Sequence, residues 1–169
     1  MTSYARHIPL ILAVCAAAFG APAHAVTQSA SVNANVVKPL SLTALQDLNL
    51  GTITLSSGSW SGATVGISRT GVFTCSAKVT CTGTRQVASF NVTGSNRMVV
   101  RITAPNVTMV NQSDATKTLT LTIDNPGQIT LPNSGNQGVI FNLGGSITLS
   151  SATVSGTYKG TINVTVDYQ

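Results

Sequence analysis

Few side chains beyond residue 25 have the chemistry for acid–base catalysis or metal binding. Both histidines, His7 and His24, lie within the first 25 residues, and the four acidic residues are all aspartates. These are Asp47, Asp114, Asp124 and Asp167. Histidine is the usual general base, the commonest metal ligand and the usual activator of serine or cysteine nucleophiles. We therefore expect no enzyme, no catalytic residue, no metal site and no cofactor; a hydrolase that pairs two aspartates is the weaker alternative.

Cys75 and Cys81 are the two cysteines that remain beyond residue 25. In an exported chain, two cysteines at short spacing predict one disulfide. The alternative, a zinc site, needs four ligands, and neither a histidine nor a second cysteine pair is at hand to complete it. We expect a Cys75–Cys81 bridge that fixes the end of a hairpin.

Residues 1–25 have the pattern of a secretory signal peptide. Arg6 precedes an apolar run over residues 8–20, and the small residues Ala23 and Ala25 flank His24 in a cleavage site. We expect a signal peptide over residues 1–25, an amino-terminal extension over 26–37 and one domain over 38–169. No later segment has the roughly eighteen consecutive apolar residues of a membrane-spanning helix, so we expect no transmembrane segment after cleavage.

The charged residues are few and dispersed. Nine Lys and Arg stand against four Asp, for a net charge of +5. Beyond the leader the basic residues are Lys38, Arg69, Lys78, Arg85, Arg97, Arg101, Lys117 and Lys159. They form no run that would follow a phosphate backbone, so nucleic acid is not an expected partner.

Alternating apolar and polar residues recur through the domain, separated by Gly, Ser, Asn and Pro. Such runs lie at residues 40–42, 48–55, 63–67, 72–75, 88–92, 98–102, 119–123, 139–143 and 147–149. This period-two pattern, without a helical stripe, predicts an all-β sandwich of about eight strands. Residues 125–127 predict a turn, and Gly144-Gly145 predicts a two-residue hairpin between two strands.

Residues 156–169 alternate without a break and predict one long final strand. One face carries Tyr158, Ile162, Val164, Val166 and Tyr168. An edge strand with an apolar face and an open side is a template for another strand. The alternative is an ordinary final strand, paired within a complete sandwich.

Three segments resemble those of chaperone-usher fimbrial subunits. In these proteins a glycine stands fourteenth from the carboxyl end and a tyrosine is penultimate, as Gly156 and Tyr168 are here. The run of Ala30, Val32, Ala34 and Val36 resembles a donor strand, and the LNLGTI motif at residues 48–53 resembles one in related spore-coat-like pilins. Over nearly the whole mature chain the layout is also similar to an uncharacterised family of secreted bacterial domains of unknown function.

The resemblance implies an immunoglobulin-like β-sandwich that lacks its last strand. A periplasmic chaperone and then a neighbouring subunit would fill the resulting groove, with an outer-membrane usher directing assembly of a fimbrium at the cell surface for cell adhesion. Ala30, Val32, Ala34 and Val36 would form the donor strand. The acceptor groove would comprise Gly156, Tyr158, Ile162, Val164, Val166 and Tyr168.

Two alternatives stay open. The run at residues 30–36 could instead be an ordinary first strand that folds back into its own domain. The whole chain could instead be a self-complete secreted sandwich that binds a glycan or surface partner through loops near Trp60 and Ser134. Trp60 is either a stacking platform for a sugar or a cover for the rim of the core.

Overall fold

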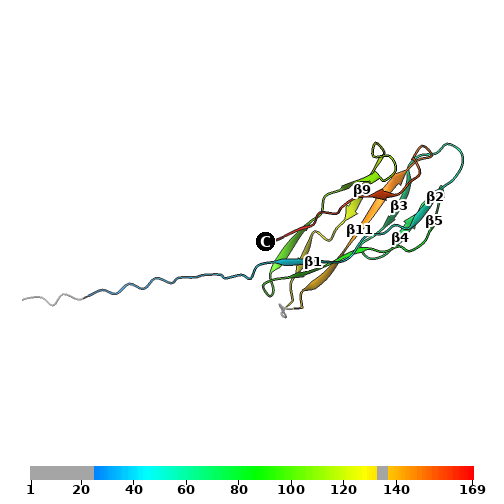
Figure 1. The fold of residues 1–169 in the computed structure, drawn as a ribbon. Helices are drawn as coiled ribbons and strands as arrows, with labels where there is room; N and C mark the ends of the chain where they lie inside the picture. Colours follow the sequence, from blue (N-terminus) through cyan, green and yellow to red (C-terminus); the bar gives the residue numbers. More distant parts are fainter. Residues whose placement is uncertain (1–24, 133–136) are drawn as a thin grey trace, which may run out of the picture. The chain divides into compact units, whose positions relative to one another are not determined.

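The structure, a computed structural model, describes residues 25–132 and 137–169 (Figure 1). It divides into two units, Met1–Asn35 and Val36–Gln169, and each is considered by itself. The expected signal peptide, apart from Ala25, and Ser134 lie outside the described residues.

The described part of the first unit, residues 25–35, forms no helix or strand. Its side chains are exposed, and the exposed fractions of Val26 and Val32 are 81% and 92%. Val36, at the start of the second unit, is 91% exposed. The alternating residues 30–36 thus form no strand.

The second unit is all-β, as predicted. Among the described residues it forms thirteen strands and no helix: β1 Ser41–Gln46, β2 Thr52–Leu55, β3 Ala63–Ile67, β4 Phe73–Cys75, β5 Val79–Thr82, β6 Ala88–Thr93, β7 Val99–Thr103, β8 Val107–Asn111, β9 Thr118–Asp124, β10 Gln128–Thr130, β11 Val139–Leu149, β12 Tyr158–Lys159 and β13 Thr165–Tyr168. Within the described part of the chain, no helix is long and apolar enough to span a membrane.

The strands form antiparallel sheets that pack as a sandwich. The largest sheet has the order β1-β6-β11-β9-β8-β12, and β3 adds to β11 and carries β4. A three-stranded sheet, β10-β7-β13, and a two-stranded sheet, β2-β5, complete the fold (Figure 1). The sandwich is confirmed. The strand number exceeds the expected eight because β5, β8 and β10 were not predicted and the expected final strand is divided into β12 and β13.

The eleven-residue strand β11 is the spine of the large sheet, and here the sequence prediction is wrong. Gly144-Gly145 is not a hairpin turn but lies buried inside β11, where pairing passes from β6 to β3 and β9. A Cβ on Gly144 would collide with the main-chain oxygen of Ile67. Gly144 is needed because neighbouring backbone approaches too closely for a side chain, whereas a Cβ on Gly145 would meet the side chains of Leu121 and Leu48.

The apolar faces of the strands meet in two clusters that share β11. The first cluster joins β6, β7 and the first half of β11, and the second joins β3, β9 and the second half of β11 with β5. Phe90 and Phe141 stack in the first cluster with ring centroids 5.6 Å apart. The predicted Cys75–Cys81 disulfide is confirmed, with the two Cα atoms 6.3 Å apart. It links β4 to β5, which pair with β3 and β2 respectively, so it joins two sheets and does not fix the end of a hairpin.

The tail is not one continuous strand, which corrects the prediction for residues 156–169. β12 pairs with β8 in the large sheet, residues 160–164 form no strand, and β13 pairs with β7 in the three-stranded sheet. β7 and β8 are consecutive in the chain but belong to different sheets, and Pro105 lies between them. The tail pairs antiparallel with β8 through β12 and with β7 through β13. It therefore passes from one sheet to the other beside the connection between β7 and β8.

Candidate functional site

Two edge strands flank the first core cluster and form the candidate site. β1 is the last strand on one side of the large sheet, and β13 is the last strand of the three-stranded sheet. β1 contains no charged residue and no proline, the two commonest protections of an exposed edge. Its register shifts between Ala44 and Gln46, so one bulge is the only such device within it.

Four of the six predicted acceptor residues lie together at this site. Ile162, Val164, Val166 and Tyr168 are partly buried and pack against the first core cluster. Leu40, just before β1, and Leu42, within it, pack against the same cluster. These two leucines were not predicted as site residues, although residues 40–42 alternate in the sequence. Half-buried apolar side chains therefore line both edges.

The other two predicted acceptor residues lie elsewhere, beside β8. Gly156 has a φ of +146°, and a Cβ there would collide with the side-chain amide of Asn111. Asn111 is 1% exposed; it donates to Ser155 O at 3.1 Å and accepts from Ser113 N–H at 2.9 Å. Gly156 is therefore required by a tight turn over a buried amide.

Tyr158 also serves the local structure. Its hydroxyl donates to the carbonyl of Val154 at 2.7 Å, and its backbone pairs with Asn111. It is not part of the apolar surface that Val164 and Val166 share with the core.

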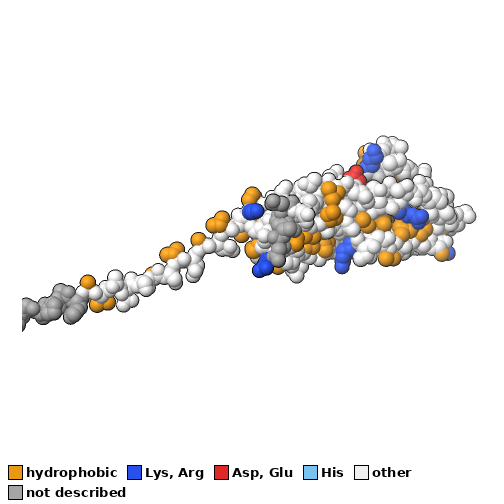
Figure 2. All heavy atoms as spheres, turned by 90° about the horizontal axis from the view of Figure 1, so that it is seen from below, with side chains coloured by type: hydrophobic (Ala, Val, Ile, Leu, Met, Phe, Trp, Pro, Cys, Tyr) orange, Lys and Arg blue, Asp and Glu red, His pale blue; other side chains and the backbone are white. Residues whose placement is uncertain are grey.

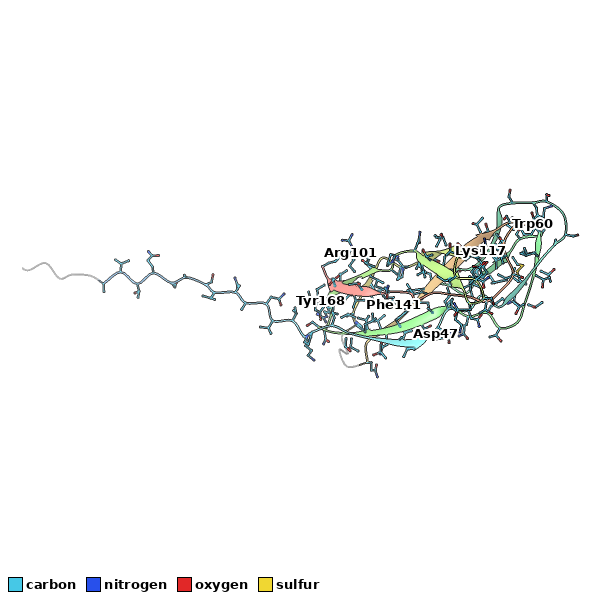
Figure 3. The ribbon with its side chains drawn as sticks, turned by 45° about the horizontal axis from the view of Figure 1, so that its top comes forward. Asp47, Trp60, Arg101, Lys117, Phe141 and Tyr168 are labelled. Atoms are coloured by element: carbon cyan, nitrogen blue, oxygen red, sulfur yellow. A yellow bond between two sulfur atoms is a disulfide. The ribbon has the colours of Figure 1, made fainter. Side chains whose placement is uncertain are left out.

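Tyr168 is held by specific hydrogen bonds rather than by packing alone. Its hydroxyl donates to Lys38 O at 2.6 Å and accepts from Ser95 N–H at 2.7 Å. The Lys38 N–H in turn donates to Ser95 Oγ at 2.6 Å. The end of β13 is thereby joined to the residues that lead into β1 (Figure 3). Lys38 and Ser95 were not predicted as site residues.

Trp60 covers the rim of the second core cluster. It is partly buried against that cluster, and its indole N–H donates to Ser56 O at 3.0 Å. Its main-chain N–H also donates to Ser151 Oγ at 3.3 Å. Because the indole packs on the core and its N–H is already hydrogen-bonded, the structure favours Trp60 as a cover for the rim of the core over Trp60 as a stacking platform for a sugar.

The ionisable groups are dispersed over the second unit. Arg69 pairs with Asp124 at 2.7 Å, and Arg85 lies over the Phe73 ring with 4.5 Å between its guanidinium carbon and the ring centroid. On the face seen in Figure 2 the Lys and Arg side chains stand singly. Within the described residues, no three His, Cys, Asp or Glu side chains come together as a metal site.

One aspartate has a shifted pKa. The pKa of Asp114 is lowered, mainly because the Thr116 hydroxyl donates to its carboxylate at 2.7 Å. The Thr116 N–H, at 3.0 Å, lowers this pKa further; desolvation opposes the shift, and the charge of Lys117 adds to it less strongly. This is a turn that binds its own carboxylate, not a catalytic pair.

Comparisons with known proteins place the second unit in a family. No curated protein and no solved structure matches the chain. One family model matches residues 40–168, from the residue before β1 to the end of β13, and so covers all thirteen strands. The chain therefore belongs to the family described as Domain of unknown function (DUF4402).

Proposed function

We propose that this chain is an exported structural subunit of a fimbria- or pilus-like surface fibre, assembled by donor-strand complementation. In this proposal Ala30, Val32, Ala34 and Val36 of one copy form the donor strand. The observation that carries it is the exposure of these side chains: Val32 and Val36 are 92% and 91% exposed in a segment without a strand partner among the described residues. Exposed valines that alternate with polar residues are typical of a surface that another molecule covers.

The unpaired edges support an acceptor in the second unit. A donor strand can add to β13, or to β1, through main-chain hydrogen bonds, while its alternate side chains reach apolar surface. Ile162, Val164 and Val166 supply that surface on the tail, and Leu40 and Leu42 supply it beside β1. In this arrangement the fold is immunoglobulin-like and its last strand comes from another molecule.

The energetics favour stable pairing. Each valine that moves from water into an apolar site contributes on the order of 1.5 kcal/mol or more, and each alanine less. The donor segment and the acceptor edges are different surfaces, so the contact is head to tail and continues into a fibre when it does not close into a ring.

The expected partners follow from the same proposal. An open acceptor must be covered before assembly, which is the role of a periplasmic chaperone, and export to the cell surface requires an outer-membrane usher. The localisation proposed is the periplasm in transit and then the cell surface. The alternative of a self-complete glycan-binding module at Trp60 has less support, because that indole packs on the core.

The central test changes one face of the donor segment at a time. Val32→Asp with Val36→Asp places charge on the donor face, and Ser31→Asp with Asn35→Asp places equal charge on the polar face. The full chain is expressed with its leader in a host that carries a chaperone and usher, and surface fibres are viewed by negative-stain electron microscopy. We expect the valine variant to abolish fibres and the polar-face variant to retain them. Fibres that form equally in both would overturn the proposal.

A second test adds the donor separately. A synthetic peptide of residues 26–37 should bind the monomeric full-length chain bearing Val32→Asp and Val36→Asp and raise its melting temperature. A scrambled peptide of the same composition should do neither. Equal effects of the two peptides would contradict a specific acceptor edge.

A further inference from the structure

An open depression of about 520 Å³ lies on the second unit, between β7 and the turn that joins β9 to β10. Its wall includes Arg101 and Thr103 on one side and Asn125, Pro126 and Gln128 on the other, with Gln169 at its rim. Arg101 and Thr103 are exposed, whereas Ile102 and Ala104, which also line the depression, are buried. Its volume is in the range of small-ligand sites.

Three polar side chains of the depression have no partner among the described residues. The register places Arg101 directly opposite Gln128 on one side and Asp167 on the other. Within residues 25–132 and 137–169, the side chains of Arg101, Gln128 and Gln169 make no hydrogen bond and no ion pair. The Asn125 side-chain oxygen accepts from Gly127 N–H at 2.7 Å, which fixes the turn and leaves the amide NH₂ group available.

These groups fit one ligand chemistry. A guanidinium binds a carboxylate through paired charge-assisted hydrogen bonds, and the side-chain amides and the Thr103 hydroxyl can both donate to and accept from sugar hydroxyls. The Asp167 carboxylate beside Arg101 reduces the local positive charge, so a single carboxylate is better accommodated than a doubly charged phosphate. Pro126 adds apolar surface for a ring face.

We propose that this depression binds the carboxylate-bearing ring of an acidic saccharide, with Arg101 holding the carboxylate. The site includes Gln169, which follows β13, but it shares no residue with Trp60, the donor strand or the apolar residues at the edges of β1 and β13. It therefore does not depend on fibre assembly, and it would give a surface fibre a repeated affinity for acidic glycans.

The test is an NMR titration of the full-length chain bearing Val32→Asp and Val36→Asp. These substitutions disable the donor strand, so the variant stays monomeric whether or not the wild-type chain forms fibres. The probes are D-glucuronate and N-acetylneuraminate, which distinguish two sources of the same carboxylate, and D-glucose is the neutral comparison. We expect backbone amides of Arg101, Thr103, Gly127 and Gln128 to shift with at least one acid, and glucose to bind at least about tenfold more weakly.

Two substitutions of equal charge change complete the test. Arg101→Gln should weaken binding by about tenfold or more, whereas Lys117→Gln, in the turn between β8 and β9, should leave it within about twofold (Figure 3). Gln128→Ala supplies an independent change in the same wall and should weaken binding by a few-fold. Amide shifts that are absent with both acids, equal binding of glucose, or unchanged affinity in Arg101→Gln would each overturn the proposal.

Discussion

The hydroxyl of Tyr168 donates a hydrogen bond to the main-chain carbonyl of Lys38 at 2.6 Å, across a separation of 130 residues. The same hydroxyl accepts from Ser95 N–H, and Gly94 leaves room for it, because a Cβ at that position would collide with the Tyr168 hydroxyl. One phenol thus joins the end of β13, the turn after β6 and the entry to β1. The two edge strands of the candidate site are held together at this point.

Tyr168→Phe should therefore destabilise the domain by about 2 kcal/mol, because it removes two hydrogen bonds and leaves a main-chain donor and acceptor without a partner. Tyr158→Phe is the matched control, since that hydroxyl makes a single bond to Val154 O. It should cost within about 1 kcal/mol. Urea unfolding of the two variants makes the comparison. Equal losses would show that the Tyr168 hydroxyl has no special structural role.

Sequence alone predicts the strands that bury one face. Residues 63–67, 88–92 and 119–123 alternate, and they form β3, β6 and β9 because burial of one face is what the alternation records. Residues 30–36 alternate in the same way and form no strand. Periodicity reports that one face needs burial; it does not report whether the partner belongs to the same molecule.

The glycines show where local pattern is insufficient. In the sequence, a glycine pair in a hairpin turn looks the same as a glycine pair packed against a neighbouring strand. What distinguishes Gly144 is its close approach to the main-chain carbonyl of Ile67, a residue distant in the sequence. Gly156 likewise depends on the buried amide of Asn111. Ile162, Val164, Val166 and Tyr168 pack against the first core cluster, but residues 160–164 form no strand, and this break could not be predicted from their unbroken alternation.

The family resemblance was partly informative. The similarity to an uncharacterised domain of unknown function is confirmed by the family match over residues 40–168. The fimbrial resemblance stays a prediction, as do export and adhesion. The Cys75–Cys81 pairing was predicted from cysteine count and spacing and is confirmed.

Removal of the disulfide should lower stability without unfolding the domain. Cys75→Ala with Cys81→Ala opens a loop with a sequence separation of 6, for which loop entropy gives a loss of about 2 kcal/mol. Thermal unfolding of the oxidised wild type, the reduced wild type and the double variant measures it. Reduction and substitution should agree closely. A double variant that no longer folds would mean that the bridge holds the core and not only the β4–β5 junction.

Gly144→Ala should be far more costly than an alanine substitution at an exposed glycine. The new methyl group would meet the Ile67 carbonyl oxygen and the main chain of Ser68, neither of which can move without disturbing β3, so we expect a loss of at least about 2 kcal/mol. Gly58→Ala is the control: it has a φ of +85° but nothing within 4 Å, and should cost only the backbone strain of about 1 kcal/mol. The denaturant midpoints of Gly144→Ala and Gly58→Ala measure the two losses of stability. Comparable losses in the two variants would refute the explanation that backbone approaches Gly144 too closely for a side chain.

Thr116→Val should raise the pKa of Asp114 toward its ordinary value. The hydroxyl of Thr116 is the largest cause of the lowered pKa, and valine keeps the shape and the main-chain N–H but removes that donor. Because the pKa of Asp114 is lower in the folded than in the unfolded chain, the ionised turn adds stability above the unfolded pKa, and this is lost as pH falls through the folded pKa. The difference in stability between wild type and variant should therefore shrink in acid.

NMR titration of the Asp114 carboxyl carbon measures this pKa directly. Thr120→Val on β9 is the control for the loss of a hydroxyl and should leave the pKa of Asp114 unchanged. An Asp114 pKa that is also unchanged in Thr116→Val would contradict the assignment of the Thr116 hydroxyl as the main cause of the shift.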